Sequence, residues 1–155
     1  MSDEAFELTH LRGDGSAVMV DVSRKPIEKR VALAEGLIRL QPATLAQINR
    51  SGIAKGNVLL VARVAAIAAV KRTDELIPLC HSLPVQHVRV DFEEEAEALR
   101  IECEVVTTAQ TGVEMEALTG VTVAALTVYD MCKAVDKAMV IDGVRLLSKR
   151  KLPAS

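Results

Sequence analysis

The sequence predicts an α+β fold in which a mainly antiparallel sheet carries helices on one face. The clearest strand signal is a hairpin, because residues 85–92 and 99–107 alternate apolar and polar side chains around an acidic turn at residues 93–97. The clearest helix signal is the stretch from 111 to about 137, which is rich in Ala, Val, Leu and Thr. Strands, helices, the hairpin, this helix and a last strand therefore follow one another, an order typical of the α+β class.

The first part of the chain is predicted to be an arm followed by two strands. Residues 1–16 are polar, contain two glycines and form the arm. Residues 17–22 are expected to be a short strand. Residues 30–40 are expected to be a second strand, although their apolar side chains give only a weak period.

Two helices are predicted to follow these strands. The first has Thr44 and Gln47 in the spacing of a capping box and ends at Ser51-Gly52. The second is capped by Asn57 and runs to about Arg72. Because this second helix is apolar nearly all round, we expect it to be buried.

The last part of the chain contains the long helix and a closing strand. Thr111 and Glu114 form a second capping box, which is expected to begin the helix. Residues 144–147 are predicted to be the closing strand, and residues 149–155 a flexible tail. The whole chain, residues 1–155, suits one domain of ordinary size.

The composition limits the kind of partner that the protein can have. Half of the residues are apolar, but the only aromatic residues are two Phe and one Tyr. Small aliphatic side chains cover little area each, so we expect oligomer formation to complete the burial. The scarcity of aromatic rings and a net charge of −2 argue against a nucleic-acid partner, whereas an anionic small ligand requires only a local cluster of cations.

The cysteines and the apolar runs predict a cytoplasmic protein with no membrane partner. Cys80, Cys103 and Cys132 form no CxxC pair, which fits a reducing compartment and argues against a disulfide framework or a four-thiolate zinc site. The longest apolar run, residues 58–70, is shorter than a membrane span and contains Arg63. The first ten residues include three acidic ones and do not resemble a signal peptide.

Four charged residues in the long helix are candidates for chemistry. Asp130 and Lys133 are three positions apart and share a helix face, so an exposed ion pair explains them by spacing alone. Their apolar neighbours instead favour a covered site, in which a carboxylate and a lysine act as an acid–base pair. Glu114 and Glu116 have simpler interpretations, as a capping-box residue and as a charge that favours the helix dipole.

The segment Leu76-Ile77-Pro78-Leu79-Cys80-His81-Ser82-Leu83-Pro84 is too short for a helix and places a histidine among apolar residues. A core histidine bonded to a backbone carbonyl and a functional histidine are equally good interpretations of His81. Neighbouring side chains of an extended segment point to opposite faces, so Cys80 and His81 do not form a dyad. Cys80 is therefore expected to be a packing residue.

Cations gather at a few places along the chain. Lys55 precedes the predicted helix at Asn57, where backbone N–H groups favour anions, but the glycine pattern of a P-loop is missing. Lys71-Arg72 and residues 149–151 are further short clusters. Each cluster alone is a common surface feature.

Several segments, taken together and in order, match the sequence motifs of a known family. They are Leu8-Thr9-His10, residues 19–23, Lys55-Gly56, Lys71-Arg72-Thr73, residues 76–81, residues 111–119 and residues 124–134. Over about Leu8 to Lys149 the chain closely resembles the cyclic pyranopterin monophosphate synthases, the molybdenum cofactor biosynthesis C proteins.

The resemblance implies a ferredoxin-like α+β fold and a homohexamer built as a trimer of dimers. It also implies conversion of 3′,8-cyclo-7,8-dihydro-GTP into cyclic pyranopterin monophosphate with release of pyrophosphate. By motif match, Asp130 is the catalytic acid–base group and Lys133 assists it. The substrate contacts fall on Leu79, Cys80, His81, Met115 and Glu116, and Lys55, Lys71, Arg72, Glu114 and Lys149 line the same pocket.

These residue types suit that chemistry. Cations are needed to hold a triphosphate and to stabilise the pyrophosphate that leaves. Rebuilding a purine as a pterin needs repeated proton transfers, which Asp130, Lys133, His81 and Glu116 can share. No cofactor and no protein-bound metal is expected, although Mg²⁺ can accompany the substrate phosphates.

Helix length adds a prediction about the assembly. Glu116 and Asp130 are separated by 14 positions, or roughly 21 Å along a straight helix. They cannot both reach one reacting atom from a single chain. We therefore expect the site to be shared between subunits.

The chain departs from the family pattern at five positions and in its tail. Ser82 stands where proline is usual, Ala66 where glycine is usual and Asn57 where aspartate is usual. Val70 and Gly120 both stand where alanine is usual, and Gly120 is expected to cost the long helix about 1 kcal/mol. The usual Gly-Gly-Lys-Ser-Gly tail is replaced by residues 150–155, which lack its permissive backbone.

Two other functions stay open from the sequence. A catalytically weak relative that acts as a binding or scaffolding oligomer is motivated by the altered tail. An unrelated thiol hydrolase would use Cys80 and a distant histidine.

Overall fold

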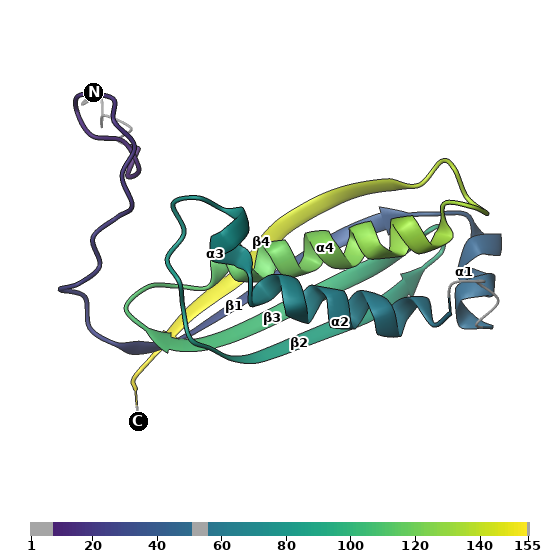
Figure 1. Cartoon of the computed structure of the whole chain (residues 1–155). Coiled ribbons are helices and arrows are strands. Elements are labelled where there is room, and N and C mark those ends of the chain that lie inside the picture. The colour runs from purple at the N-terminus through teal and green to yellow at the C-terminus, as the bar shows by residue number, and fades with distance from the viewer. Residues whose placement is uncertain (1–7, 51–55, 155) are drawn as a thin grey trace, which may run out of the picture.

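The computed structural model describes residues 8–50 and 56–154 and contains one four-stranded antiparallel sheet (Figure 1). The strands lie in the order β2-β3-β1-β4, so the first and third strands of the chain form the centre. Long alternating segments and a short acidic turn produce the hairpin of β2 and β3, as predicted. The strands are β1 (Glu28–Arg39), β2 (Val85–Glu95), β3 (Ala98–Ala109) and β4 (Val140–Leu152).

The helices cover one face of this sheet, with α2 and α4 lying side by side across it (Figure 1). β1 and β2 are joined through three helices and β3 and β4 through one, and each connection leaves one strand between its two ends. This is the ferredoxin-like arrangement. The predicted α+β fold is confirmed. The helices are α1 (Pro42–Asn49), α2 (Val58–Val70), α3 (Thr73–Leu76) and α4 (Glu114–Cys132).

The core lies between α4 and the two central strands and is built from small side chains. Alternation places Ala34 and Gly36 of β1 toward the helices, opposite Cys103 and Ile101 of β3. A Cβ atom on Gly36 would lie 2.6 Å from a methyl of Val121, so the glycine allows α4 to approach the sheet closely. The small residues allow the helix and sheet layers to pack closely, although the core has few aromatic rings.

The opposite face of the sheet carries a network of ion pairs. Glu35 lies 3.5 Å from Arg100 and 2.6 Å from Arg145, and Arg100 also contacts Glu102 at 2.8 Å. These charges alternate in sequence with the core residues of β1, β3 and β4, as expected for a sheet with one covered face. The apolar core therefore lies on the helical side of the sheet.

One predicted helix cap is present and two are wrong. Asn57 accepts a hydrogen bond from the Leu60 N–H at 3.0 Å, as predicted. α1 begins at Pro42, before the expected cap, and the Thr44 hydroxyl donates to the buried Asp136 carboxylate at 3.0 Å. α4 begins at Glu114, so Glu114 is the first residue of the helix and not the third residue after a Thr111 cap.

Two strand predictions and the tail prediction need correction. Residues 17–22 are not a strand, since the arm forms only an isolated bridge between Leu11 and Ala17. β4 is longer than residues 144–147 at both ends. It continues to Leu152, so residues 149–152, expected to belong to the tail, pair with the first residues of β1.

The expectation that α2 is buried all round is wrong on one side. Leu60 and Val64 are 53% and 59% exposed, whereas Ala62 and Ala66 are fully buried. The apolar composition of α2 therefore exceeds what one chain can bury, which leaves an apolar stripe on its outer side. Within the ranges 8–50 and 56–154, no helix is both long enough and apolar enough to span a membrane.

Candidate active site

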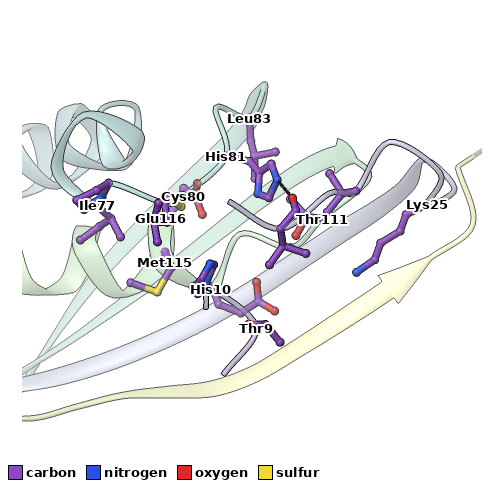
Figure 2. A pocket seen from close by; sticks show the side chains of 16 residues that line it. Thr9, His10, Lys25, Ile77, Cys80, His81, Leu83, Thr111, Met115 and Glu116 are labelled. Atoms are coloured by element: carbon purple, nitrogen blue, oxygen red, sulfur yellow. Dashed lines mark hydrogen bonds between the residues drawn. The ribbon is translucent and has the colours of Figure 1, made fainter. Parts of the chain in front are cut away.

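A cavity of about 600 Å³ lies where the arm, the loop after α3 and the first turn of α4 meet (Figure 2). Most of its wall is aliphatic, and a few polar groups project into it. Such a combination is typical of sites for small organic ligands. The cavity is lined by Thr9, His10, Val20, Val22 and Lys25 of the arm, by residues 77–81 and Leu83 of the loop, and by residues 111–112 and 114–116.

The loop after α3 is held by short-range bonds at both ends. The Cys80 N–H donates to the Ile77 carbonyl at 3.1 Å, which turns the chain after the helix. The Ser82 hydroxyl donates to the Asp74 carboxylate on α3. Ser82 thus anchors the loop to α3, at a position where the family that the chain resembles usually has proline.

Glu116 is a buried carboxyl group that faces the cavity. It is only 3% exposed, and the Cys80 thiol donates to its Oε1 at 3.9 Å. Its Oε2 has no hydrogen-bond partner among residues 8–50 and 56–154. Burial, with a smaller contribution from the negative charge of Glu114, raises the pKa of Glu116 to about 7. A carboxyl group that changes protonation near neutrality is suited to acid–base catalysis.

Cys80 lies beside Glu116 and is held as a thiol. Burial and the nearby charges of Glu116 and Asp74 raise the pKa of Cys80 to about 11. The thiolate, which is the nucleophilic form, is therefore scarce at neutral pH. This finding argues against the thiol hydrolase that the sequence left open.

His81 lines the cavity and also bonds to a backbone carbonyl, so the backbone interpretation is confirmed, whereas a functional role stays a prediction. Its Nε2 lies 2.6 Å from the Val20 carbonyl, marked by the dashed line in Figure 2. A carbonyl only accepts, so Nε2 carries the hydrogen and the neutral ring has its acceptor at Nδ1. His81 thereby joins the loop to the arm.

A second, cationic cavity of about 390 Å³ adjoins the first. The two cavities share Lys25, Thr111, Gly112 and Glu114, so they lie next to each other. Lys149 on β4 lies 3.3 Å from the Glu114 carboxylate at the start of α4. The cations of the second cavity are Lys25, Arg30, Lys149, Arg150 and Lys151.

The sequence prediction included Lys149 but missed Lys25 and Arg30 as site residues. Arg30 is 8% exposed and pairs with Glu28 at 2.8 Å, and strand pairing places it opposite Lys151. No motif indicates these two residues. For Arg30 the signal is the register between β1 and β4, which cannot be read from either strand alone.

Two other predicted cations lie away from both cavities. Lys71 and Arg72 are exposed at the end of α2 and line neither cavity. Lys55 lies outside the described residues. The predicted residues Leu79, Cys80, His81, Glu114, Met115 and Glu116 all line the first cavity.

Asp130 and Lys133 lie at the other end of α4. They form an ion pair of 2.9 Å, and both side chains are more than half exposed. This hydrogen bond and the carboxylate charge raise the pKa of Lys133. The apolar neighbours therefore do not cover the pair within one chain. Asp130 and Lys133 line a separate hollow with Tyr129, Ala134 and Lys137.

Glu116 and Asp130 line different cavities of one chain, as their separation along the helix predicts, and the sharing of a site between subunits stays a prediction. α4 carries one set of predicted residues at its start and the other at its end. Among the residues that the structure places, no group of three or more His, Cys, Asp or Glu is arranged to hold a metal ion.

Replacing Glu116 by Gln should stabilise the protein relative to the wild type, by an amount that increases as the pH rises. An unfolded glutamate has a pKa of about 4.3, so between that value and about 7 the folded protein binds more protons and its free energy of unfolding falls as pH rises. Glu116→Gln lacks this loss. Its advantage should grow from about pH 4, reach roughly 3–4 kcal/mol and level off above pH 7.

Urea unfolding at several pH values measures this difference. Glu94→Gln, at an exposed position of β2, is the matched control and should show no such trend. A Glu116→Gln advantage that does not change with pH would contradict a buried, titrating carboxyl group.

Comparison with known proteins places these features in a family. The MoaC family model matches residues 19–151. A protein of Chloroflexus aggregans is 57% identical over 152 residues, which cover 97% of this chain and 92% of the relative. A protein of Corynebacterium efficiens is 56% identical over 143 residues, 92% of each chain. Both relatives carry the name cyclic pyranopterin monophosphate synthase. The chain belongs to the MoaC family.

Proposed function

We propose that this protein converts 3′,8-cyclo-7,8-dihydro-GTP to cyclic pyranopterin monophosphate and pyrophosphate, in the biosynthesis of the molybdenum cofactor. The observation that carries the proposal is the pairing of two adjoining cavities, one aliphatic with a buried carboxyl group and one cationic. The substrate has two matching parts, a heterocycle that suits the aliphatic cavity and a triphosphate that suits the cationic one. The relatives named above support the same activity.

The cationic cavity is the place for the phosphates. Lys25, Arg30 and Lys149 can neutralise the triphosphate and stabilise the charge that develops on the pyrophosphate. A sugar hydroxyl attacks the α-phosphate, a new P–O bond forms, and the P–O bond to the leaving pyrophosphate breaks. The hydroxyl proton passes to a base of the site. We propose that Mg²⁺, where present, arrives with the phosphates and that the protein needs no resident cofactor.

The aliphatic cavity is the place for the ring chemistry. Glu116 can give and take a proton near neutral pH, and the acceptor Nδ1 of His81 can bond the heterocycle. Asp130 is the catalytic acid–base group by motif match, and the ammonium group of Lys133 stabilises the negative charge of its carboxylate. In one chain these two residues are too far along α4 to join Glu116.

We further propose that a second copy supplies Asp130 and Lys133. The outer side of α4 has no charged residue from 117 to 129, and Leu126 on it is 53% exposed. Glu116 and Asp130 are equally distant from Val123. Two copies of α4 that pack antiparallel about a twofold axis at Val123 therefore place Glu116 of each beside the opposite Asp130. A hexamer would contain three such dimers.

The three free thiols of the described chain fit the reducing cytoplasm.

Incubating the pure protein with 3′,8-cyclo-7,8-dihydro-GTP tests the proposed function. Pyrophosphate and cyclic pyranopterin monophosphate should appear in equal amounts, and a Cys80→Ala variant should keep activity because Cys80 is not the nucleophile. Absence of both products at every pH would overturn the proposal and favour a scaffolding role. Loss of turnover in Cys80→Ser, with folding intact, would restore the thiol mechanism.

A further inference from the structure

The N-terminal arm folds into a small hairpin that carries His10 to the cavity. The His10 carbonyl accepts a hydrogen bond from the Val18 N–H at 2.9 Å, and the Arg12 N–H donates to the Ser16 carbonyl at 2.9 Å. Gly15 takes a φ of 81° at the turn, which few other residues adopt readily. The hairpin extends beyond the body of the molecule in Figure 1, yet Thr9 and His10 line the aliphatic cavity.

The arm is fixed to the cavity by the residue that the motif match assigns to the substrate. His81 donates to the Val20 carbonyl at 2.6 Å, two residues beyond Val18. A second bond, from the Gln110 side chain to the Ser23 carbonyl at 3.1 Å, holds the arm where it joins the body. The position of His10 therefore follows from contacts within the site and not from the sheet.

The hydrogen bonding of His10 determines which ring nitrogen is available. Its Nδ1 lies 3.3 Å from the Val18 carbonyl, which can only accept, so Nδ1 carries the hydrogen. The neutral ring then has a lone pair at Nε2. Of the other titratable groups in this wall, Cys80 is held as a thiol and His81 uses one nitrogen for the arm.

The same cavity contains an unsatisfied polar atom that favours a ligand. Glu116 is buried, and its Oε2 has no partner in the described part of the chain. Buried polar atoms are nearly always hydrogen-bonded, so a bound molecule is expected to complete this one. Figure 2 shows His10 and Glu116 among the side chains that line one cavity, so a ligand that reaches Glu116 lies within the wall that includes His10.

We propose that His10 is a further catalytic residue, which contacts the heterocycle of the substrate and accepts a proton at Nε2. This inference rests on the proposed function. In the step, an N–H or O–H bond of the substrate breaks, an N–H bond forms on His10, and the electron pair stays on the substrate. The imidazolium returns the proton to a later intermediate or to water, so no oxidant or reductant is involved.

Imidazole rescue distinguishes this role from a structural one. His10→Ala should lower kcat by about 10²–10⁴-fold with a smaller change in KM, and added imidazole should restore part of kcat in proportion to its concentration. His87→Ala is the matched control, because His87 is exposed on β2 and lines neither cavity, and it should retain wild-type kinetics. A His10→Ala enzyme within twofold of wild type would overturn the proposal. So would full activity of His10→Gln, whose amide cannot accept the proton.

A binding measurement separates failure of this inference from failure of the proposed function. In protein with ¹⁵N-labelled histidine, GTP should shift the ring signals of His10 and leave those of His87 unchanged. If the wild type forms no product but GTP shifts His10, the activity is wrong and the placement of His10 stands. If the wild type turns over and His10→Ala equals it, only the inference about His10 is wrong.

Discussion

Chains with Glu116→Ala and chains with Asp130→Ala, each nearly inactive alone, should regain about a quarter of wild-type activity when they are mixed. Each single variant loses a proton-transfer group and should fall by about 10²–10⁴-fold in kcat. The recovery follows from the positions of the two residues at opposite ends of α4, in separate cavities. A dimer of unlike chains combines an intact Glu116 from one copy with an intact Asp130 from the other at one of its two sites.

The expected fraction follows from symmetry. Random pairing makes about half of all dimers mixed, and each mixed dimer has one intact and one doubly altered site. About a quarter of all sites are therefore restored. Co-expression of differently tagged chains and mass spectrometry of the unselected mixture establish the composition before pyrophosphate release is measured.

A second pair of variants provides the control. Glu116 and His81 line the same cavity of the same chain, so mixing Glu116→Ala with His81→Ala restores no site and should restore no activity. Recovery in this control, or none in verified Glu116→Ala and Asp130→Ala oligomers, would show that the site is not shared as proposed.

Gly120→Ala should destabilise the protein, whereas the combined change Val70→Ala and Gly120→Ala should be better tolerated than the two single changes predict. A Cβ atom at position 120 would lie 2.7 Å from the Cys103 sulfur and 2.9 Å from a methyl of Val70. Overpacking of this kind costs about 1–3 kcal/mol, which outweighs the gain of about 1 kcal/mol in helix propensity.

The two departures from the family pattern are thus expected to be coupled. The methyl of Val70 occupies space beside α4 that an alanine at position 120 would need, so the larger residue on α2 compensates for the smaller one on α4. A double-mutant cycle from urea unfolding should give a coupling energy of about 1–2 kcal/mol in favour of the double variant.

Val105→Ala combined with Gly120→Ala is the control for this cycle. Val105 is also fully buried but is not among the atoms nearest to Gly120, so its effect should be additive. Equal coupling in both cycles would indicate a general loosening of the core instead of a direct exchange of volume between Val70 and Gly120.

The sequence predicts the elements whose pattern is local. The hairpin of β2 and β3 follows from alternation and an acidic turn, and the Asn57 cap follows from residue type and position. The Thr44 cap is wrong because the hydroxyl finds a tertiary partner, Asp136, which is 92 positions away in the chain. Local spacing cannot anticipate such a competitor.

The candidate site divides in the same way. Residues 79–81 and 114–116 could be recognised because they lie in continuous motifs. Lys25 and Arg30 could not, since they lie in no such motif, and Arg30 is brought near Lys149 only by the pairing of β1 with β4. The exposed ion pair of Asp130 and Lys133 is the interpretation that their spacing supports, whereas the covered site that their apolar neighbours favour is not formed within one chain.

The extension of β4 to Leu152 has a consequence for the end of the reaction. In this chain the cations Lys149 and Lys151 lie on a paired strand, whereas the family pattern that the chain resembles has a glycine-rich tail after the position of Lys149. A preorganised anion site loses little conformational entropy on binding, so it holds phosphates more tightly than a tail that must first become ordered. The same rigidity slows departure. Pyrophosphate should therefore have a long residence time, and its release would govern the rate of turnover.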